Sequence, residues 1–235
     1  MHLQWSHANT IWENRMRRFI HYTSCLTFLV LFASVASAQR PKNAAFAEVK
    51  DAENLPRVLL IGDSISIGYT VPVREALKGK ANVHRAPTNC GPTTRGLAQI
   101  DSWLGNGKWD VIHFNWGLHD LKFIDGKRQV PLDEYEKNLH TLTKRLKETG
   151  ATLIWCSTTP YPADVSPKRI PEDAVKYNEA AARVMKEFEV ETDDLYTFAL
   201  DKLDDIQQPS NVHFTPSGSK VLGQQVSRQI EMRLK

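Results

Sequence analysis

The sequence predicts an α/β fold, a three-layer α/β/α sandwich around a doubly wound, flavodoxin-like parallel sheet of about five strands. Short apolar runs alternate with longer segments of helical periodicity from residue 57 to the C-terminus. Such alternation is typical of a parallel sheet with helices on both faces. Glycine and polar residues collect directly after the apolar runs, at the sheet edge where this kind of fold binds its ligands.

Five apolar segments are expected to form the strands: residues 57–64, 82–87, 109–117, 151–160 and 195–200. The segments between them are expected to be helical: 64–80 with an interruption near Pro72, 91–105 as a loop and helix, 133–150, 172–188, and a last helix from Thr215 with Pro216 at its first position. In 133–150, apolar residues recur at helical spacing until Gly150 ends the pattern.

Residues 1–38 are predicted to be a secretory signal peptide. Arginines at 15, 17 and 18 form a basic start, an apolar run covers 26–35, and Ala36-Ser37-Ala38 fits a cleavage site. The run is short for a membrane span, so none is expected after cleavage; an uncleaved anchor is the alternative. We therefore expect an exported protein, periplasmic or extracellular.

The rest of the chain is expected to form one domain, residues 56–235, after a linker or lead-in strand at 39–55. Met16 is an alternative start. The formal net charge is +3, and because the leader holds three Arg and one Glu, the mature charge is near +1. Nothing in this balance predicts nucleic-acid binding.

Two cysteines, Cys90 and Cys156, remain after the leader. Export permits a disulfide between them, but the sequence leaves their pairing open. Cys90 is interpreted as a small buried thiol in preference to a nucleophile. No cofactor or metal is predicted.

Ser64 and His213 are the candidate catalytic residues. Ser64 follows Gly62-Asp63 at a strand-to-helix turn, which would present its hydroxyl at the sheet edge, although it could also simply cap the helix. His213 lies in a loop before the last helix, and that loop returns to the same edge. A serine hydroxyl needs a neighbouring base to attack an ester, and histidine serves well.

Four stretches, "IGDSIS", "NCGPTTRGL", "GLHD" and "NVHFTPSG", follow the block order of the SGNH/GDSL hydrolases, which the chain resembles from about residue 57 to its C-terminus. The resemblance implies that Ser64 is the nucleophile, His213 the general base, and the backbone N–H groups of Ser64 and Gly91 oxyanion donors.

Two positions depart from this family pattern. The asparagine expected as third oxyanion donor is replaced by His119, whose imidazole could donate in neutral or charged form. Asn115 is the rival donor. Alternatively, His119 is structural and holds its loop through Asp120, itself expected to anchor that loop. Asp63 is expected to bond backbone amides of neighbouring loops.

The second departure is Ser210, which stands where the family has an aspartate three residues before the base. We consider three outcomes: the Ser210 hydroxyl or a backbone carbonyl orients His213, Asp204 or Asp205 folds back onto it, or the site is inactive.

The sequence favours a serine esterase that cleaves small acyl esters, with O-acetyl groups on carbohydrate suggested by the resemblance and the leader. Trp116 could offer a sugar-stacking face or be packing. The main alternative is a non-catalytic glycan-binding domain on a decayed site. A metal-dependent phosphoesterase using Asp63, His119, Asp120 and His213 is a third reading.

Overall fold

The computed structural model describes residues 43–234, and the predicted signal peptide lies outside this range. Its five-stranded sheet is wholly parallel, in the order β2-β1-β3-β6-β7. The strands are β1 (Arg57–Ile61), β2 (Asn82–Arg85), β3 (Val111–Phe114), β6 (Thr152–Cys156) and β7 (Glu191–Asp193). This is the flavodoxin-like order, and the predicted fold class is confirmed.

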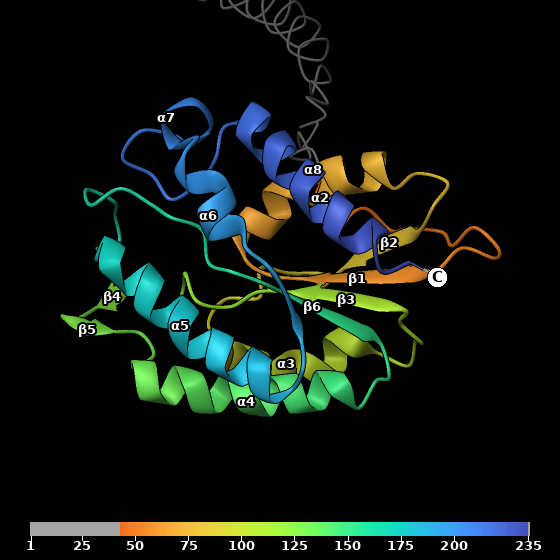
Figure 1. Ribbon diagram of the computed structural model, residues 1–235, viewed down its shortest axis with the longest axis horizontal. Helices are drawn as coiled ribbons and strands as arrows, with labels where there is room; N and C mark the ends of the chain where they lie inside the picture. The colour runs from red at the N-terminus through yellow and green to blue at the C-terminus, as the bar shows by residue number, and fades with distance from the viewer. Residues whose placement is uncertain (1–42, 235) are drawn as a thin grey trace, which may run out of the picture. The chain divides into compact units, whose positions relative to one another are not determined.

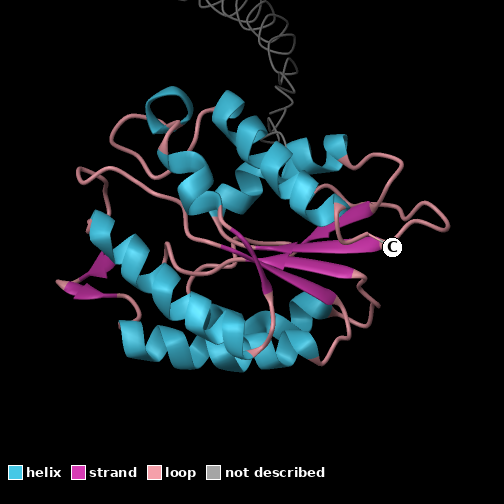
Figure 2. Ribbon diagram, in the orientation of Figure 1, coloured by secondary structure: helices cyan, strands magenta, loops and turns pink. Residues whose placement is uncertain are grey.

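Helices cover both faces of the sheet, as Figures 1 and 2 show. On one face lie α2 (Ser64–Ala76) and α8 (Pro216–Glu231), with the short α6 (Leu195–Leu200) and α7 (Leu203–Ile206) packed beside α8. On the other lie α3 (Thr93–Leu104), α4 (Leu132–Lys147) and α5 (Pro171–Glu187). A hairpin, β4 (Phe123–Ile124) with β5 (Lys127–Arg128), projects between β3 and α4 in the chain. The expected linker contributes a 3-10 turn, η1 (Ala44–Phe46), and no strand among its described residues.

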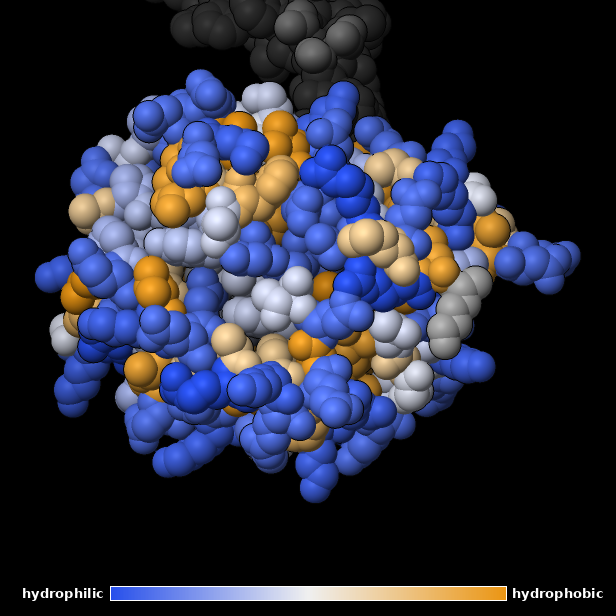
Figure 3. All heavy atoms as spheres, viewed as in Figure 1, coloured by the Kyte–Doolittle hydropathy of each residue, from blue (hydrophilic) through white to orange (hydrophobic). Residues whose placement is uncertain are grey.

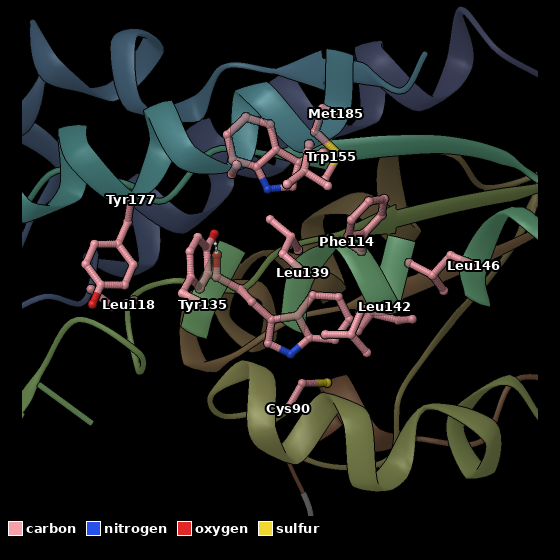
Figure 4. Packing of buried hydrophobic residues seen from close by; sticks show 14 of the residues in the cluster. Cys90, Phe114, Leu118, Tyr135, Leu139, Leu142, Leu146, Trp155, Tyr177 and Met185 are labelled. Atoms are coloured by element: carbon pink, nitrogen blue, oxygen red, sulfur yellow. Dashed lines mark hydrogen bonds between the residues drawn. The ribbon is translucent and has the colours of Figure 1, made fainter. Parts of the chain in front are cut away.

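The three central strands, β1, β3 and β6, supply side chains to two hydrophobic clusters, one on each face. In β1, Leu59 and Ile61 enter the cluster under α3, α4 and α5, while Val58 and Leu60 enter the cluster under α2 and α8. This alternation follows from the two-residue period of a strand. Figure 4 shows the first cluster, where leucines of α4 point toward Phe114.

The face of the molecule shown in Figure 3 is mostly polar. Figure 3 shows hydrophilic residues over most of the face in view, with smaller hydrophobic patches between them. No helix within residues 43–234 combines the length and the apolar character needed to cross a membrane.

The prediction of a strand at 195–200 was wrong. The fifth strand is β7, and residues 195–200 form the helix α6. Asp194 caps this helix by accepting a hydrogen bond from the Thr197 amide at 3.1 Å. Leu195 and Ala199, four residues apart, are its buried side chains, which is a helical spacing that a short apolar run does not reveal.

The expected interruption at Pro72 is also absent, since α2 runs continuously from Ser64 to Ala76. A proline inside a helix removes one hydrogen bond, so other contacts must compensate. Pro72 lies against Gly223 of α8, where an added Cβ would stand 2.6 Å from the Pro72 Cβ. The proline is therefore a point of close packing between α2 and α8.

Asp120 joins two loops at the carboxyl edge of the sheet. Its side chain is fully buried, and one oxygen accepts hydrogen bonds from the Thr93 amide at 2.8 Å and the Thr93 hydroxyl at 2.5 Å. Thr93 begins α3, and Pro92 before it offers no side-chain cap, so Asp120 caps this helix from the loop after β3. Burial raises the pKa of Asp120 to about 7.

Asp120→Asn is expected to change how stability depends on pH. A carboxyl of pKa about 7 when folded and about 3.9 when unfolded binds its proton more tightly in the folded state. The wild type therefore loses stability as pH rises from 4 to 7, by at most about 1.4 kcal/mol per pH unit. Asparagine keeps the accepting oxygen and does not titrate. The stability of the variant relative to the wild type should therefore increase as the pH rises over that range. Urea unfolding of both proteins at pH 5, 6, 7 and 8 measures this, and a constant difference would contradict it.

Candidate active site

Ser64 is the first residue of α2, directly after the turn that follows β1. Asp63 caps the helix by accepting a hydrogen bond from the Ile65 amide at 2.9 Å, and its side chain is buried. The turn is tight, because a Cβ on Gly62 would lie 2.7 Å from the Ser66 Cβ. These features place the Ser64 hydroxyl at the sheet edge and its amide at the positive end of a helix.

His213 reaches Ser64 from the loop between α7 and α8. Its Nε2 lies 2.8 Å from the Ser64 Oγ, although 149 residues separate the two in sequence. The loop is closed by backbone bonds: the Gln208 amide donates to the His213 carbonyl at 3.0 Å, and the Thr215 amide donates to the Ile206 carbonyl at 2.8 Å. The structure therefore brings together the two residues that the sequence predicted as nucleophile and base.

The Asn211 side chain fixes the His213 ring. Its Oδ1 lies 2.8 Å from His213 Nδ1 and also accepts the His213 backbone amide at 3.0 Å. An amide oxygen only accepts, so Nδ1 carries the proton and Nε2 presents its lone pair to the Ser64 hydroxyl. Sequence reasoning missed Asn211, but its signal was present: an Asx turn, in which the side chain bonds the amide two residues on, is common for asparagine in loops.

The candidates that the sequence offered for this orienting role were wrong. Ser210 points elsewhere, because its backbone adopts a left-handed conformation with φ of 51° and its hydroxyl bonds to Asp164. Asp204 and Asp205 are exposed and make no hydrogen bond to His213.

Two of the predicted oxyanion donors are engaged by other groups in this structure. The Gly91 amide donates to the Asn89 Oδ1 at 2.9 Å, within its own loop. Asn115 is buried, and its Nδ2 donates to the Cys156 carbonyl at 2.7 Å, which ties the end of β3 to β6. The Asn115 amide is therefore an anchor between strands, which weakens its case as the rival donor.

Among the described residues, the His119 ring has a hydrogen-bond partner at only one of its two nitrogens. Its Nδ1 lies 3.4 Å from the Lys122 Nζ, and since an ammonium only donates, Nδ1 accepts and Nε2 carries the hydrogen. Burial lowers the pKa of His119, the Asp63 carboxylate opposes this, and the charges of Lys122 and Arg169 lower it further. The neutral form offers one donor, at Nε2, and the charge of His213 also lowers the pKa of His119.

The residues of the metal-dependent reading do not form a metal cluster within the described chain. Asp63 and Asp120 are used as helix caps, as described above. A group of possible ligands does occur elsewhere: His113, Cys156 and Asp193 are buried, with ligand atoms within 4.8 Å of one another. There the His113 Nε2 and the Asp193 Oδ2 already pair at 3.1 Å.

The remaining sequence candidates are structural. Cys90 and Cys156 are free thiols buried on opposite faces of the sheet, so they do not pair. Burial raises the pKa of Cys90 to about 11, so its thiol stays protonated at neutral pH. Trp116 is 1 % exposed and packs against Gly96 in the core, so it offers no stacking face to a sugar.

Several solved structures share this fold. A lipase/acylhydrolase from Enterococcus faecalis is 22% identical with a TM-score of 0.67, covering 77% of this chain and 98% of its own. An acetyl xylan esterase is 16% identical with a TM-score of 0.64, covering 74% and 99%. An acetyl-xylooligosaccharide esterase mutant from Geobacillus is 18% identical with a TM-score of 0.62, covering 74% and 94%.

No curated protein matches the sequence at a significant level. The family model for GDSL-like lipases and acylhydrolases matches residues 60–221, which spans the chain from β1 into α8 and contains Ser64 and His213. The chain therefore belongs to the GDSL-like Lipase/Acylhydrolase family and is an ester-cleaving hydrolase.

Proposed function

We propose that the protein is a serine esterase in which Ser64, His213 and Asn211 form a catalytic triad with a neutral third member. The observation that carries this proposal is the chain of two 2.8 Å hydrogen bonds from Ser64 Oγ to His213 Nε2 and from His213 Nδ1 to Asn211 Oδ1. A serine whose hydroxyl donates to an oriented imidazole is an activated nucleophile. A glycan-binding domain would need neither bond.

In the first step, Ser64 Oγ attacks the acyl carbon of the ester while His213 Nε2 takes the hydroxyl proton. The oxyanion that forms is stabilised by the Ser64 amide and by His119 Nε2–H. His213 then passes its proton to the leaving alcohol, and an acyl-enzyme remains on Ser64. In the second half, His213 takes a proton from water while the water oxygen attacks the acyl carbon. His213 then gives this proton to the Ser64 Oγ as the bond between Ser64 and the acyl carbon breaks, and the acid is released.

The acyl group is proposed to be small. A cavity bordered by residues on both sides of the nucleophile, Asp63 and Ile65, and by Leu118 and Thr158, has a volume of about 10 Å³. That is room for about one water molecule, so the cavity cannot take up a long acyl chain. Two of the similar structures are described as esterases of acetylated xylan or xylooligosaccharide, which supports an O-acetyl carbohydrate as substrate. We also propose that the protein is exported after cleavage behind Ala38.

A fluorophosphonate probe tests the nucleophile. We expect a single adduct on intact protein, mapped to the Ser64 peptide, and none on Ser64→Ala. Buried Ser66, two residues along the same helix, makes Ser66→Ala a matched control that should keep the adduct. If folded wild-type protein took up no probe, the glycan-binding alternative would replace the esterase proposal.

Asn211→Ala should lower kcat by about 10²- to 10⁴-fold with little change in KM, because the ring loses the bond that sets its tautomer. Asn211→Asp keeps both accepted hydrogen bonds and adds a charge that stabilises the imidazolium. We expect it to be at least as active as wild type, with the rise of its pH profile moved to higher pH. Steady-state kinetics with 4-nitrophenyl acetate measure both. Wild-type kcat in Asn211→Ala would remove Asn211 from the triad.

The pH profile of kcat/KM is expected to be a single rise toward a plateau. His213 must be unprotonated to act as base, and burial lowers the pKa of His119 so that it is neutral throughout the working range. A charged His119 donor would instead give a bell-shaped profile. His119→Asn, which keeps one donor that does not titrate, is the control. If kcat/KM of the wild type fell between pH 7 and 9, and that of His119→Asn did not, the charged imidazole would be the donor.

A further inference from the structure

Arg169 is a buried cation close to the proposed oxyanion donor. It lies in the loop between β6 and α5 with 5 % of its surface exposed. Its Nε donates to the Leu118 carbonyl at 3.0 Å, next to His119, and its Nη1 donates to the Pro167 carbonyl at 3.0 Å. Within residues 43–234, no carboxylate lies at ion-pair distance from its guanidinium, and Nη2 has no hydrogen-bond partner.

Lys122 adds a second cation at the same place. Its Nζ contacts His119, and it too has no ion pair in the described part of the chain. The two cations meet the same loop, because Arg169 bonds the carbonyl of Leu118 and Lys122 contacts the next residue, His119. Burial lowers the pKa of Lys122, and the charge of Arg169 lowers it further. The acids that act on them are Asp63 and Asp120, and both are held as helix caps.

Two cations beside a catalytic site without a paired acid are an unusual arrangement. A buried charge is costly unless it is paired, and natural proteins seldom keep one without a use for it. The Arg169 fork is also held in place by two backbone carbonyls, so it is oriented before any ligand arrives. A planar guanidinium with free N–H groups fits a carboxylate through two parallel hydrogen bonds.

We propose that Arg169 and Lys122 form a subsite that binds a carboxylate on the alcohol part of the substrate, so that the preferred substrates are acyl esters of acidic sugars. This inference rests on the proposed esterase function. The carboxylate is assigned to the alcohol part because the acyl group is proposed to be small, and the cavity bordered by Asp63 and Ile65 has no room for a long acyl chain. Lys122 supplies the second positive charge at the same loop.

The test compares two acetate esters that differ only in charge, 3-acetoxybenzoate and its methyl ester, each corrected for its rate of alkaline hydrolysis. In wild type, kcat/KM for the carboxylate should exceed that for the neutral ester by about 10- to 100-fold, the range for hydrogen bonds to a charged group. Arg169→Gln should bring this ratio close to one, and Arg169→Lys should keep only part of it.

Arg183→Gln is the matched control. Arg183 is exposed on α5 and pairs with Glu136 of α4, so its loss changes the net charge equally but leaves the subsite intact. This variant should keep the wild-type ratio. If Arg169→Gln also kept it, or lowered both esters equally, Arg169 would serve the loop and the proposal would fail. If Arg169→Gln did not fold, Lys122→Met replaces it, with a ratio reduced by severalfold expected and an unchanged ratio counting against the subsite.

Inactivity toward both esters would be a failure of the esterase proposal alone. The subsite is then tested by calorimetric titration with sodium glucuronate and with methyl glucoside. Binding of glucuronate only, lost in Arg169→Gln, would support the subsite. Equal binding of both sugars, or no binding to wild type, would overturn it.

Discussion

The packing of α8 against α2 is the constraint on which the site depends. Ser64 opens α2 and His213 stands just before α8, so the 2.8 Å bond between them follows from how these two helices sit together. Their approach is close because Gly223 has no side chain, and the Tyr69 carbonyl and Pro72 ring of α2 occupy the space that a Cβ would need. A larger residue at 223 would push α8 outward and separate base from nucleophile.

The same logic explains the Thr-Pro-x-Gly stretch after His213. Thr215 caps α8 by accepting the Gly218 amide at 3.0 Å, and Pro216 takes the first helical position, where no amide hydrogen is needed. Gly218 lies so close to the Ile206 carbonyl that an added Cβ would stand 2.1 Å from its oxygen. The motif thus anchors the start of α8 to α7 and fixes the short loop that holds His213.

Local signals explain which parts could be predicted from the sequence. The sequence predicted four of the five strands, and it predicted Ser64 and His213 as site residues. These predictions succeeded because strands, turns and capped helices depend on residues that are close together in the sequence. Asp194, a local cap, was overlooked, and α6 was misassigned as a strand. Asn211 was missed because the family pattern directs attention three residues before the base, whereas the Asx turn places the partner two residues before it. Arg169 was not predictable, since its contact with the Leu118 carbonyl spans 51 positions and leaves no periodic trace.

The charged residues around the candidate site would stabilise a negative oxygen better than a positive imidazolium. In the proposed mechanism, the acyl oxygen becomes negative at the transition state and His213 becomes positive. Asn211 provides orientation without a charge, so it does less for the imidazolium than a carboxylate would. On the side proposed for the oxyanion, Lys122 contacts His119 and Arg169 bonds the carbonyl of the residue before it. Both charges would favour a negative oxygen at the proposed donor, His119 Nε2–H. The Gly91 amide donates to the Asn89 side chain and could donate to an oxyanion only if that asparagine turned away. The proposed oxyanion hole therefore has two donors, the Ser64 amide and His119. Under the proposed mechanism, the site therefore relies on oxyanion stabilisation more than on imidazolium stabilisation, with His119 as the proposed donor in place of the usual amide.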